Sequence, residues 1–557
     1  MNLLRSRSSA ALLAALLAAA PAGAQQPPAA PEAPQSVFGE QIDVRVVNVE
    51  VVVTDRQGNR VQNLGPSDFR LKVDGKVIPV EYFSEVRGGQ AIAGSGTDAE
   101  AAPLPGLPSL APGSPVGTSY LVFIDNVFSI GARRNEVLRT LKEDLARLGP
   151  EDRMAIVSYD GRLQMLSTWS NSERDLSRAI DNAIHEPSYG AQRLAELRMF
   201  ETSNSLTGER IEPGPRASFA ERLDIDELGF VQRLAGQVER AVHGAVSTLR
   251  GFAAPPGRKV FLMLSGGWPF SPADYAINNP NRPVLTTSDL PRGEEILRPL
   301  IDTANRLGYT IYPVDVPGVE AQATSALTQG PIAGGINIRE RENEASLEFV
   351  AEQTGGRALL NSGRAKALET VSSDTRSYYW LGFTPTWEGN DKRHDVSVEL
   401  VKPLPGFKVR SRESFLDLSR KAEVSMMVES AMLFGNAPGS APMPVQLGAA
   451  AASGRKLMQV PLTLAIPVDA ITFVPVNGKY VSELELRIAA QDEKGNQADM
   501  PVVPLSLSTD QQPQPGGYVR YETTLTLRKL RHDLTIAIFD PLSGRITTAA
   551  VKVAPPK

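Results

Sequence analysis

The sequence predicts an α/β protein in which a parallel sheet carries helices on both faces, with β-rich modules before and after it. Two observations lead to this prediction. Between residues 118 and 373, short continuous apolar runs alternate with segments of helical periodicity, which is typical of βαβ units in a sheet buried on both faces. Outside that range, apolar residues recur at period two between turn residues, as they do in antiparallel strands.

The composition limits the class of protein. The chain has 557 residues, of which 42% are hydrophobic, and this is more apolar material than one core uses. Its formal net charge of -5 argues against nucleic acid as a partner, because proteins that bind a phosphate backbone carry a cationic excess. The chain has no cysteine, which excludes disulfides, thiol catalysis and cysteine-ligated metals.

The first 24 residues have the pattern of a signal peptide. Arg5 and Arg7 precede an apolar run over residues 10–20, and small residues follow up to Ala24, after which we expect cleavage. No later apolar stretch approaches twenty residues, so we expect no membrane anchor. These features predict a secreted or periplasmic protein.

The β-rich segment before the α/β domain is expected to start after a Pro/Ala linker at residues 25–40. Residues 41–86 predict a small β unit, because valines alternate at period two from Val47 and Asp74-Gly75 is a hairpin signal. Residues 87–117 are rich in Gly, Pro, Ser and Ala, a composition that predicts a flexible linker.

Five apolar runs predict the strands of the α/β domain, which we assign to residues 118–373. Each later run follows a helical segment or a turn, and the runs read TSYLVFID, DRMAIVSYD, RKVFLMLSGG, GYTIYPVDV and GRALL. The stretch 186–226 interrupts the alternation, so we expect it to be an inserted surface excursion.

The remainder of the chain is predicted to be β-rich. Strands in residues 374–416 come too late and are too short for another βαβ unit, so we expect them to complete the N-terminal β unit. Residues 417–454 predict a helix followed by a Gly/Ala/Pro linker. Residues 455–557 place strands at regular spacing, which predicts a β-sandwich of the Ig-like type.

These segments resemble a known family. The runs LVFIDNVFS, EDRMAIVSYDGRLQML, RKVFLMLS and GYTIYPVDV, with the tail SYYWLGFTP, are similar to a von Willebrand factor type A (VWA) domain. From about residue 42 to 415 the chain resembles the secreted VWA-domain proteins of acidobacterial-type bacteria. The resemblance implies a Rossmann-like domain that contacts other proteins.

The resemblance also implies a metal-ion-dependent adhesion site. In VWA domains an Asp-x-Ser-x-Ser motif, a Thr and a second Asp hold Mg²⁺, whose open position accepts a partner's carboxylate. Asp125 matches the first Asp, Ser129 the second Ser, and Ser170 stands in the place of the Thr. Val127 replaces the first Ser and Gly266 the second Asp, so this chain departs from the family's ligand set.

Two interpretations of this departure remain. In the one we expect, the site is degenerate and needs no cofactor: Asp125 accepts backbone N–H bonds in its loop, and Ser129 is the N-cap of the next helix. In the alternative, the residual site binds Mg²⁺, and Asp160 or Asp274 could supply the missing carboxylate.

Catalytic patterns are weak. The four histidines are scattered without a zinc-binding pair. Ser265 in LMLSGGW invites comparison with a nucleophilic serine, but it lacks the leading glycine of hydrolases and a positioned histidine. We therefore expect no enzyme.

The function we expect is protein–protein contact or scaffolding in the cell envelope. The alternatives are a Mg²⁺-dependent adhesin that captures an acidic ligand and a hydrolase that uses Ser265. The expected contact surface is the carboxyl-end face of the sheet, with the residues Asp125, Asn126, Ser129, Ser170, Gly266 and Trp268.

Overall fold

The computed structural model describes most of the chain, and all structural statements concern the described residues. These are residues 46–92, 113–207, 225–252, 257–277, 291–316, 333–360, 366–386, 388–402, 405–434, 443–493 and 500–556. The predicted signal peptide (1–24) and Pro/Ala linker (25–40) lie outside them. No described helix is both long enough and apolar enough to cross a membrane.

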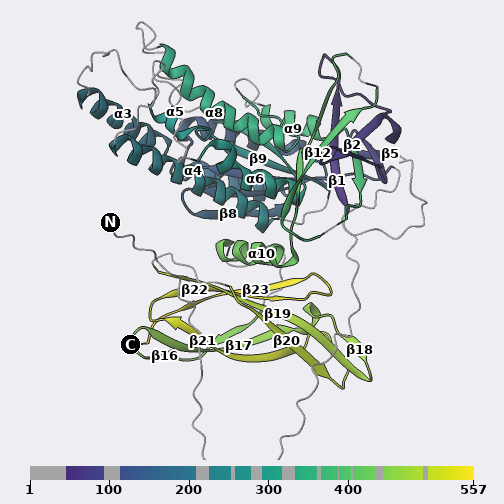
Figure 1. Ribbon diagram of the computed structural model, residues 1–557, viewed down its shortest axis with the longest axis vertical. Helices are drawn as coiled ribbons and strands as arrows, with labels where there is room; N and C mark the ends of the chain where they lie inside the picture. The colour runs from purple at the N-terminus through teal and green to yellow at the C-terminus, as the bar shows by residue number, and fades with distance from the viewer. Residues whose placement is uncertain are drawn as a thin grey trace, which may run out of the picture. The chain divides into compact units, whose positions relative to one another are not determined.

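A five-stranded sheet forms the centre of the α/β domain (Figure 1). Its strand order is β10-β9-β6-β7-β8. The central strand β6 pairs in parallel with β7 on one side and β9 on the other, and β9 pairs in parallel with β10. The bounds are β6 Thr118–Asp125, β7 Arg153–Tyr159, β8 Leu163–Ser170, β9 Arg258–Ser265 and β10 Tyr309–Asp315.

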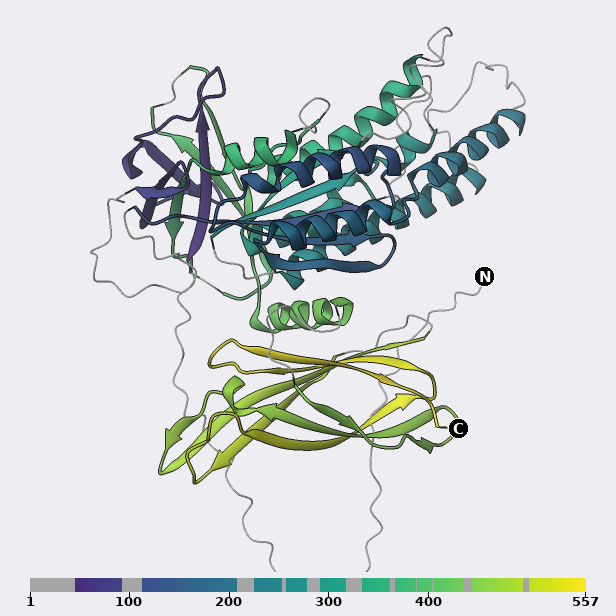
Figure 2. The same cartoon turned by 180° about the vertical axis from the view of Figure 1, so that it is seen from behind.

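Helices cover both faces of this sheet, as Figure 1 and, from behind, Figure 2 show. Leu121 and Phe123 of β6 belong to one apolar cluster, and Val122 and Ile124 to the other, because successive side chains of a strand point to opposite faces. The first cluster includes residues of α4 (Ile225–Gly251), α6 (Gly293–Leu307) and α8 (Ala333–Gln353), and the second includes residues of α1 (Gly131–Glu143), α2 (Glu173–His185) and α9 (Ala367–Thr375).

The sheet is mixed, whereas the sequence predicted a parallel one. The edge strand β8 runs antiparallel to β7. Only the turn around Gly161 joins the two strands, and a connection of this length cannot carry the crossover that a parallel pair needs. The predicted strand at 356–360 forms only one bridge in the described residues, between Leu359 and Val314 of β10.

The predicted excursion at 186–226 begins with a loop at 186–189 and is helical in the rest of its described part. It contains α3 (Gly190–Thr207) and the start of α4. Phe200 of α3 stacks on Phe230 of α4 with 4.2 Å between the ring centroids. A Cβ at Gly190 would lie 2.6 Å from the carbonyl oxygen of Ser129, so the chain can enter α3 this close to β6 only with a glycine.

The N-terminal strands pair with strands that follow the α/β domain. Two sheets with the orders β13-β1-β11-β4-β5 and β14-β12-β2-β3 share one apolar cluster, and the α/β domain is therefore inserted into a β unit. The strands are β1 Val47–Thr54, β2 Phe69–Val73, β3 Lys76–Ile78, β4 Tyr82–Arg87, β5 Gln90–Ile92, β11 Tyr378–Phe383, β12 Lys392–Leu400, β13 Lys408–Ser411 and β14 Ser414–Asp417.

The expected linker at 87–117 is ordered at both described ends. Gln90 begins the short strand β5 and also bridges to Pro115. Backbone hydrogen bonds between Ala91 and Ser114 and between Gly113 and Ala91 add to this pairing. A Gly/Pro-rich composition therefore did not exclude local pairing here, because the backbone donors and acceptors at this edge bond with each other.

Buried ion pairs join the β unit to the amino end of the α/β sheet. Arg258, the first residue of β9, lies 3.1 Å from the carboxylate of Glu50 on β1, and both side chains are buried. The Arg258 guanidinium also lies 4.2 Å from the centre of the Tyr378 ring and donates to the carbonyl oxygen of Thr375 at 3.0 Å. This arrangement compensates the charge of a fully buried arginine.

A second buried carboxylate completes this junction. Asp374 of α9 accepts hydrogen bonds from Arg60, from Arg410 at 2.9 Å and from the Tyr312 hydroxyl at 2.6 Å. Burial alone would raise the pKa of Asp374, but the charges of Arg410 and Arg60 and these hydrogen bonds hold it well below its usual range. We call this cluster the amino-end junction; it comprises Glu50, Arg60, Arg258, Tyr312, Asp374, Tyr378 and Arg410.

The C-terminal part contains two antiparallel sheets that share an apolar cluster including Leu462, Leu484 and Ile536. The helix α10 (Arg420–Phe434) precedes them, and its Val424 and Val428 pack on Ala537 and Phe539. The strands are β15 Val445–Leu447, β16 Ala451–Ser453, β17 Leu457–Pro467, β18 Val474–Val476, β19 Lys479–Asp492, β20 Val502–Thr509, β21 Tyr518–Arg528, β22 His532–Phe539 and β23 Ile546–Val553.

The predicted linker within 417–454 ends earlier than expected. β15 and β16 lie inside it and pair with β17. These strands are three residues long and flanked by small residues, so the hydropathy pattern carries little signal for them.

Candidate functional site

The carboxylate of Asp125 is the centre of the predicted site. Asp125 is the last residue of β6 and is fully buried. Its Oδ2 accepts hydrogen bonds from the Ser265 hydroxyl at 2.7 Å and the Trp268 indole N–H at 2.9 Å. Its Oδ1 accepts from the backbone N–H groups of Val127 at 2.9 Å and Phe128 at 3.2 Å. Four protein donors therefore satisfy this carboxylate.

The burial of Asp125 has electrostatic consequences. Burial raises the pKa of Asp125, and the four hydrogen bonds act in the opposite direction. Burial and the nearby charge of Asp125 raise the pKa of Tyr159 to about 12. The hydrogen bonds hold the loop after β6 against the loop after β9, so Asp125 joins two neighbouring strand ends.

Ser129 lies at this end of the sheet but does not cap a helix. The N-cap of α1 is Ile130, which makes no side-chain cap, so the predicted capping role of Ser129 is wrong. The chain reaches helical conformation one residue later than the capping pattern required. The Ser129 hydroxyl is buried and has no hydrogen-bond partner in the described structure, which is an unusual state for a buried polar atom.

Ser170 lies at the other end of the sheet, and the prediction that it joins Asp125 is wrong. Ser170 pairs with Met154 at the start of β7, whereas Asp125 pairs with Tyr159 at its end. Five residues of extended strand separate these positions by roughly 16 Å. The physical reason is the antiparallel direction of β8, and the Ser170 hydroxyl accepts instead from the backbone N–H of Ser172 before α2.

The loop that does reach the site follows α2 and comprises residues 186–189. Glu186 accepts hydrogen bonds from the Asn126 amide at 2.9 Å and the Ser158 hydroxyl at 3.0 Å. The backbone N–H of Tyr189 donates to the carbonyl oxygen of Asn126 at 2.8 Å. Asn126 also accepts from Arg134 and is 1% exposed, so it is part of the interior. A polar loop after an amphipathic helix was the only sequence signal for this contact.

The loop after β9 has no room for a carboxylate at its first position. A Cβ at Gly266 would lie 2.3 Å from the carbonyl oxygen of Phe128 and 3.2 Å from that of Val316. Trp268 is 1% exposed, with its indole N–H on Asp125 and its backbone N–H on the Ser346 hydroxyl at 3.1 Å. Asn126 and Trp268 were predicted to be on a binding face, but both are buried because their polar atoms are used within the fold.

The residues present do not form a ligand set for Mg²⁺. This ion takes six oxygen ligands in octahedral geometry, but both oxygens of Asp125 already accept from N–H and O–H donors. The carboxylate oxygens of Asp160 accept within its own turn, from the N–H of Arg162 and the amide of Gln164. The described residues contain no group of three His, Cys, Asp or Glu side chains that could hold a metal.

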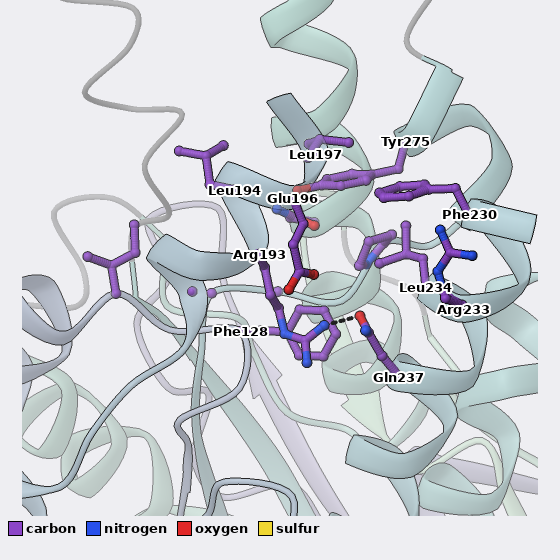
Figure 3. A pocket seen from close by; sticks show the side chains of 16 residues that line it. Phe128, Arg193, Leu194, Glu196, Leu197, Phe230, Arg233, Leu234, Gln237 and Tyr275 are labelled. Carbon is purple, nitrogen blue, oxygen red and sulfur yellow. Dashed lines mark hydrogen bonds between the residues drawn. The ribbon is translucent and has the colours of Figure 1, made fainter. Parts of the chain in front are cut away.

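A pocket opens beside these loops at the carboxyl end of the sheet (Figure 3). It has a volume of about 90 Å³ and is lined from the loop after β6 and from α3, α4, α5 (Pro272–Ile277) and α8. We call it the carboxyl-end pocket; among its lining residues are Phe128, Arg193, Leu197, Phe230, Arg233 and Leu234.

Arg193 links this pocket to the loop after Asp125. Its Nε donates to the carbonyl oxygen of Val127 at 3.0 Å and its Nη1 donates to Gln237. Its guanidinium lies 4.9 Å from the centre of the Phe128 ring. Figure 3 shows the guanidinium between Phe128 and Gln237 at the wall of the pocket. The guanidinium is therefore held in one place; no carboxylate of the described residues lies within ion-pair distance of it, although the charges of Glu196 and Asp125 act on it.

Ser265 has the surroundings of a structural residue. Its side chain is fully buried, donates to Asp125 and accepts from the Gly267 N–H at 3.2 Å. All four histidines are described, and their Nδ1 atoms bond elsewhere: to the carbonyl oxygens of Asp181, Glu239 and Leu530 and to the carboxylate of Asp74. Among the described residues the Ser265 hydroxyl therefore has no histidine partner, and its proton is directed to the buried carboxylate of Asp125.

Comparison with solved structures finds VWA domains among the similar proteins. A von Willebrand factor type A protein from Catenulispora acidiphila is 9% identical, with 93% of this chain and 76% of that chain covered and a TM-score of 0.22. The vWF domain of the type V pili tip protein Mfa5 from Porphyromonas gingivalis is 13% identical over 46% of this chain and 94% of its own, with a TM-score of 0.19.

An aerotolerance-related membrane protein from Bacteroides fragilis is 12% identical over 46% of this chain and all of its own, with a TM-score of 0.24. No family model matches the chain, and no curated protein matches it. At such low TM-scores the likeness carries no argument about this chain, so the strand order and the hydrogen bonds of this chain carry the functional argument.

Proposed function

We propose that this chain is a non-enzymatic protein of the cell envelope that binds a protein partner at its carboxyl-end pocket without a bridging cation. The observation that carries the proposal is the pairing of two features at one end of the sheet. Asp125 is satisfied by four protein donors, and beside it an open pocket presents polar and apolar side chains. In this proposal the metal site is degenerate, and recognition uses the pocket's own side chains.

The hydrogen bonds of Asp125 support a cation-independent site. A bound Mg²⁺ would have to take the place of the Ser265 and Trp268 donors on Oδ2, and these donors sit in a packed interior where rearrangement is costly. Gly266 cannot be replaced by a carboxylate without moving two carbonyl groups. We infer that the hydrogen-bonded form is the working form.

The location and the flanking modules are proposed from the sequence. The first 24 residues carry the pattern of a signal peptide, so we propose a secreted or periplasmic protein. We propose that the two C-terminal antiparallel sheets form an Ig-like module. Such a module would serve as a scaffold that presents the α/β domain.

A Mg²⁺-dependent adhesin is the competing function, and one observation favours it. The Ser129 hydroxyl is buried at the carboxyl end of the sheet and has no hydrogen-bond partner among the described residues. An empty metal-ligand position would have the same property. The proposal therefore needs a test in which the cation is varied.

The test uses site-specific photo-cross-linking in the mature chain. A photoreactive residue is introduced at Arg233, which lines the pocket, and as a matched control at Arg174, an exposed arginine of α2 on the other face of the sheet. Each protein is incubated with envelope extract of the producing organism, in EDTA or in Mg²⁺. We expect one partner to be captured from position 233, not from 174, and equally in both buffers.

Two results would overturn the proposal. Equal capture from positions 174 and 233 would show that the pocket is not the contact. Capture that requires Mg²⁺, together with saturable heat in a Mg²⁺ titration that an Asp125→Ala variant loses, would establish the adhesin.

A further inference from the structure

We propose that the carboxyl-end pocket recognises the free C-terminal residue of a partner chain, with the terminal carboxylate at Arg193 and Arg233 and an apolar last side chain against the leucines. This inference rests on the proposed function and names the group that the pocket takes. The ligand that this pocket would take is an apolar last residue with an ionised terminal carboxylate.

Arg193 supplies the fixed positive charge. Two of its three guanidinium nitrogens donate to Val127 and Gln237, and its Nη2 has no partner in the described part of the chain. The Phe128 ring at 4.9 Å restrains the guanidinium plane. A guanidinium held in this way loses little further freedom when it binds a carboxylate, which is the geometry that planar anion recognition favours.

Arg233 supplies a second cation on the same wall. It lies 5.8 Å from the centre of the Phe230 ring and, within the described ranges, forms neither an ion pair nor a hydrogen bond. The one acidic side chain of the lining is Glu196, whose Oε1 accepts from Gln192 at 3.0 Å. The described lining thus holds two cations and one anion in a chain of net charge -5. The charges of Glu196 and of the buried Asp125 act on Arg193, whereas the exposed Arg233 has no such partner among the described residues and favours an anionic ligand.

The apolar wall decides which anion fits. Leu194, Leu197, Leu234 and Phe230 line the same cavity, and Figure 3 shows Leu234 and Phe230 on the side opposite Leu194. A volume of about 90 Å³ corresponds to roughly three water molecules or one aliphatic side chain. An Asp or Glu side chain brings a carboxylate with little apolar surface, whereas a C-terminal residue carries a carboxylate and an apolar side chain on one Cα.

The probe that tests this is a set of fluorescein-labelled hexapeptide pools. The last three positions are randomised over Ala, Val, Leu, Phe and Ser, and the C-terminus is either a free acid or an amide. A third pool has an amidated end and a Glu at the fifth position. Binding to the purified mature chain is followed by fluorescence anisotropy, and bound peptides are identified by mass spectrometry.

We expect the free-acid pool to bind, with Val, Leu or Phe enriched at the last position, and the amidated pool to bind about tenfold more weakly. Arg233→Gln should weaken binding about threefold, and Glu196→Gln should strengthen it about twofold, because both charges are partly screened by solvent. Arg193→Gln should weaken it about tenfold. Because Arg193 also donates to Val127, the unfolding temperature of the Arg193→Gln variant is measured as well. The variants Arg233→Gln and Glu196→Gln change exposed side chains and therefore test the inference independently of folding.

Two outcomes would overturn the inference: equal binding of the acid and amide pools, or preferential binding of the pool with an internal Glu. If either occurs while the cross-linker at position 233 still captures a partner in EDTA, the proposed function stands and only the chain-end chemistry is wrong. If the cross-linker also fails, both are wrong.

Discussion

The amino-end junction and the carboxyl-end pocket lie at opposite ends of the same strands and both contain arginines, but they use them differently. In the junction Arg258 faces the Glu50 carboxylate and the Tyr378 ring, and it is 1% exposed. In the pocket Arg193 and Arg233 lie over phenylalanine rings, and no described carboxylate lies within ion-pair distance of either.

The difference separates charge that holds the fold from charge that is available to a ligand. A buried cation must be paired, because an uncompensated charge in a low-dielectric interior is strongly destabilising. A cation at the rim of a pocket keeps contact with water and can be left without a carboxylate. The presence of an arginine alone therefore does not identify a binding site. An arginine that lacks a carboxylate partner within the protein does.

The largest expected effect is in the junction. Asp374→Asn removes the charge that compensates Arg60 and Arg410 and should lower the free energy of unfolding by about 3–5 kcal/mol. Urea denaturation of the full chain, followed by tryptophan fluorescence, measures this loss. The control is Asp181→Asn, which breaks an exposed pair with Lys142 and should cost less than about 0.5 kcal/mol. If Asp374→Asn and Asp181→Asn lost equal free energies of unfolding, buried and exposed ion pairs would contribute alike to the stability of this protein.

A smaller loss of stability is expected at Asp125. This residue is buried like the amino-end junction but lies close to the carboxyl-end pocket. Trp268→Phe deletes the indole donor to Oδ2 and leaves Ser265 as the only donor on that oxygen. The expected loss is about 2 kcal/mol, measured by the same denaturation experiment. If Mg²⁺ restored the lost stability, the carboxylate would be a cation ligand after all.

Lys259 tests how the amino end of the sheet tolerates a buried cation, whose Nζ donates to the carbonyl oxygen of Leu307 at 2.8 Å. Burial, together with the charge of Arg412, lowers the pKa of Lys259 from 10.5 to about 8. The unfolded chain therefore binds more protons than the folded chain between these two pH values, and the stability contributed by this position rises with pH across that window. Relative to Lys259→Met, wild type should gain about 2–3 kcal/mol from pH 8 to 10.5. A constant difference across this range would mean that Lys259 is charged and solvated.

The smallest effect is expected at Ser129. Ser129→Ala removes a buried hydroxyl that has no hydrogen-bond partner among the described residues, so stability should stay the same or increase by less than about 1 kcal/mol. Thermal unfolding in EDTA and in Mg²⁺ measures it. If Ser129→Ala lost stability only in Mg²⁺, Ser129 would be a metal ligand. The carboxylate of Asp125 would then be paired with a cation, as the carboxylates of the amino-end junction are paired with arginines.

The fold class followed from the sequence because buried strands and amphipathic helices have different periods. The predicted runs TSYLVFID, DRMAIVSYD and RKVFLMLSGG contain the strands β6, β7 and β9, which end at Asp125, Tyr159 and Ser265. The direction of β8 was not predicted, since a hydropathy pattern carries no strand direction. The short β15 and β16 were assigned to a linker for lack of a pattern.

The site was harder to predict than the fold because it depends on which loops meet. The resemblance to VWA domains placed Ser170 beside Asp125, in the position of the motif's Thr. The antiparallel direction of β8 instead places it at the other end of the sheet. Glu186 carried no motif, yet it bonds Asn126 at the strand end. The burial of Trp268 could not be foreseen either, since its indole N–H is satisfied by a residue 143 positions away.

The insertion of the α/β domain into the β unit has a mechanical consequence. β1 lies hydrogen-bonded between β11 and β13, one of which follows the whole α/β domain and the other the strand β12. Tension applied before β1 and after β14 would therefore load the hydrogen bonds of the β unit first, while the α/β domain between them stays outside the path of the force. When the chain is stretched in an optical trap, the β unit should unfold before the α/β domain. The carboxyl-end pocket would therefore keep its shape while the protein is under tension.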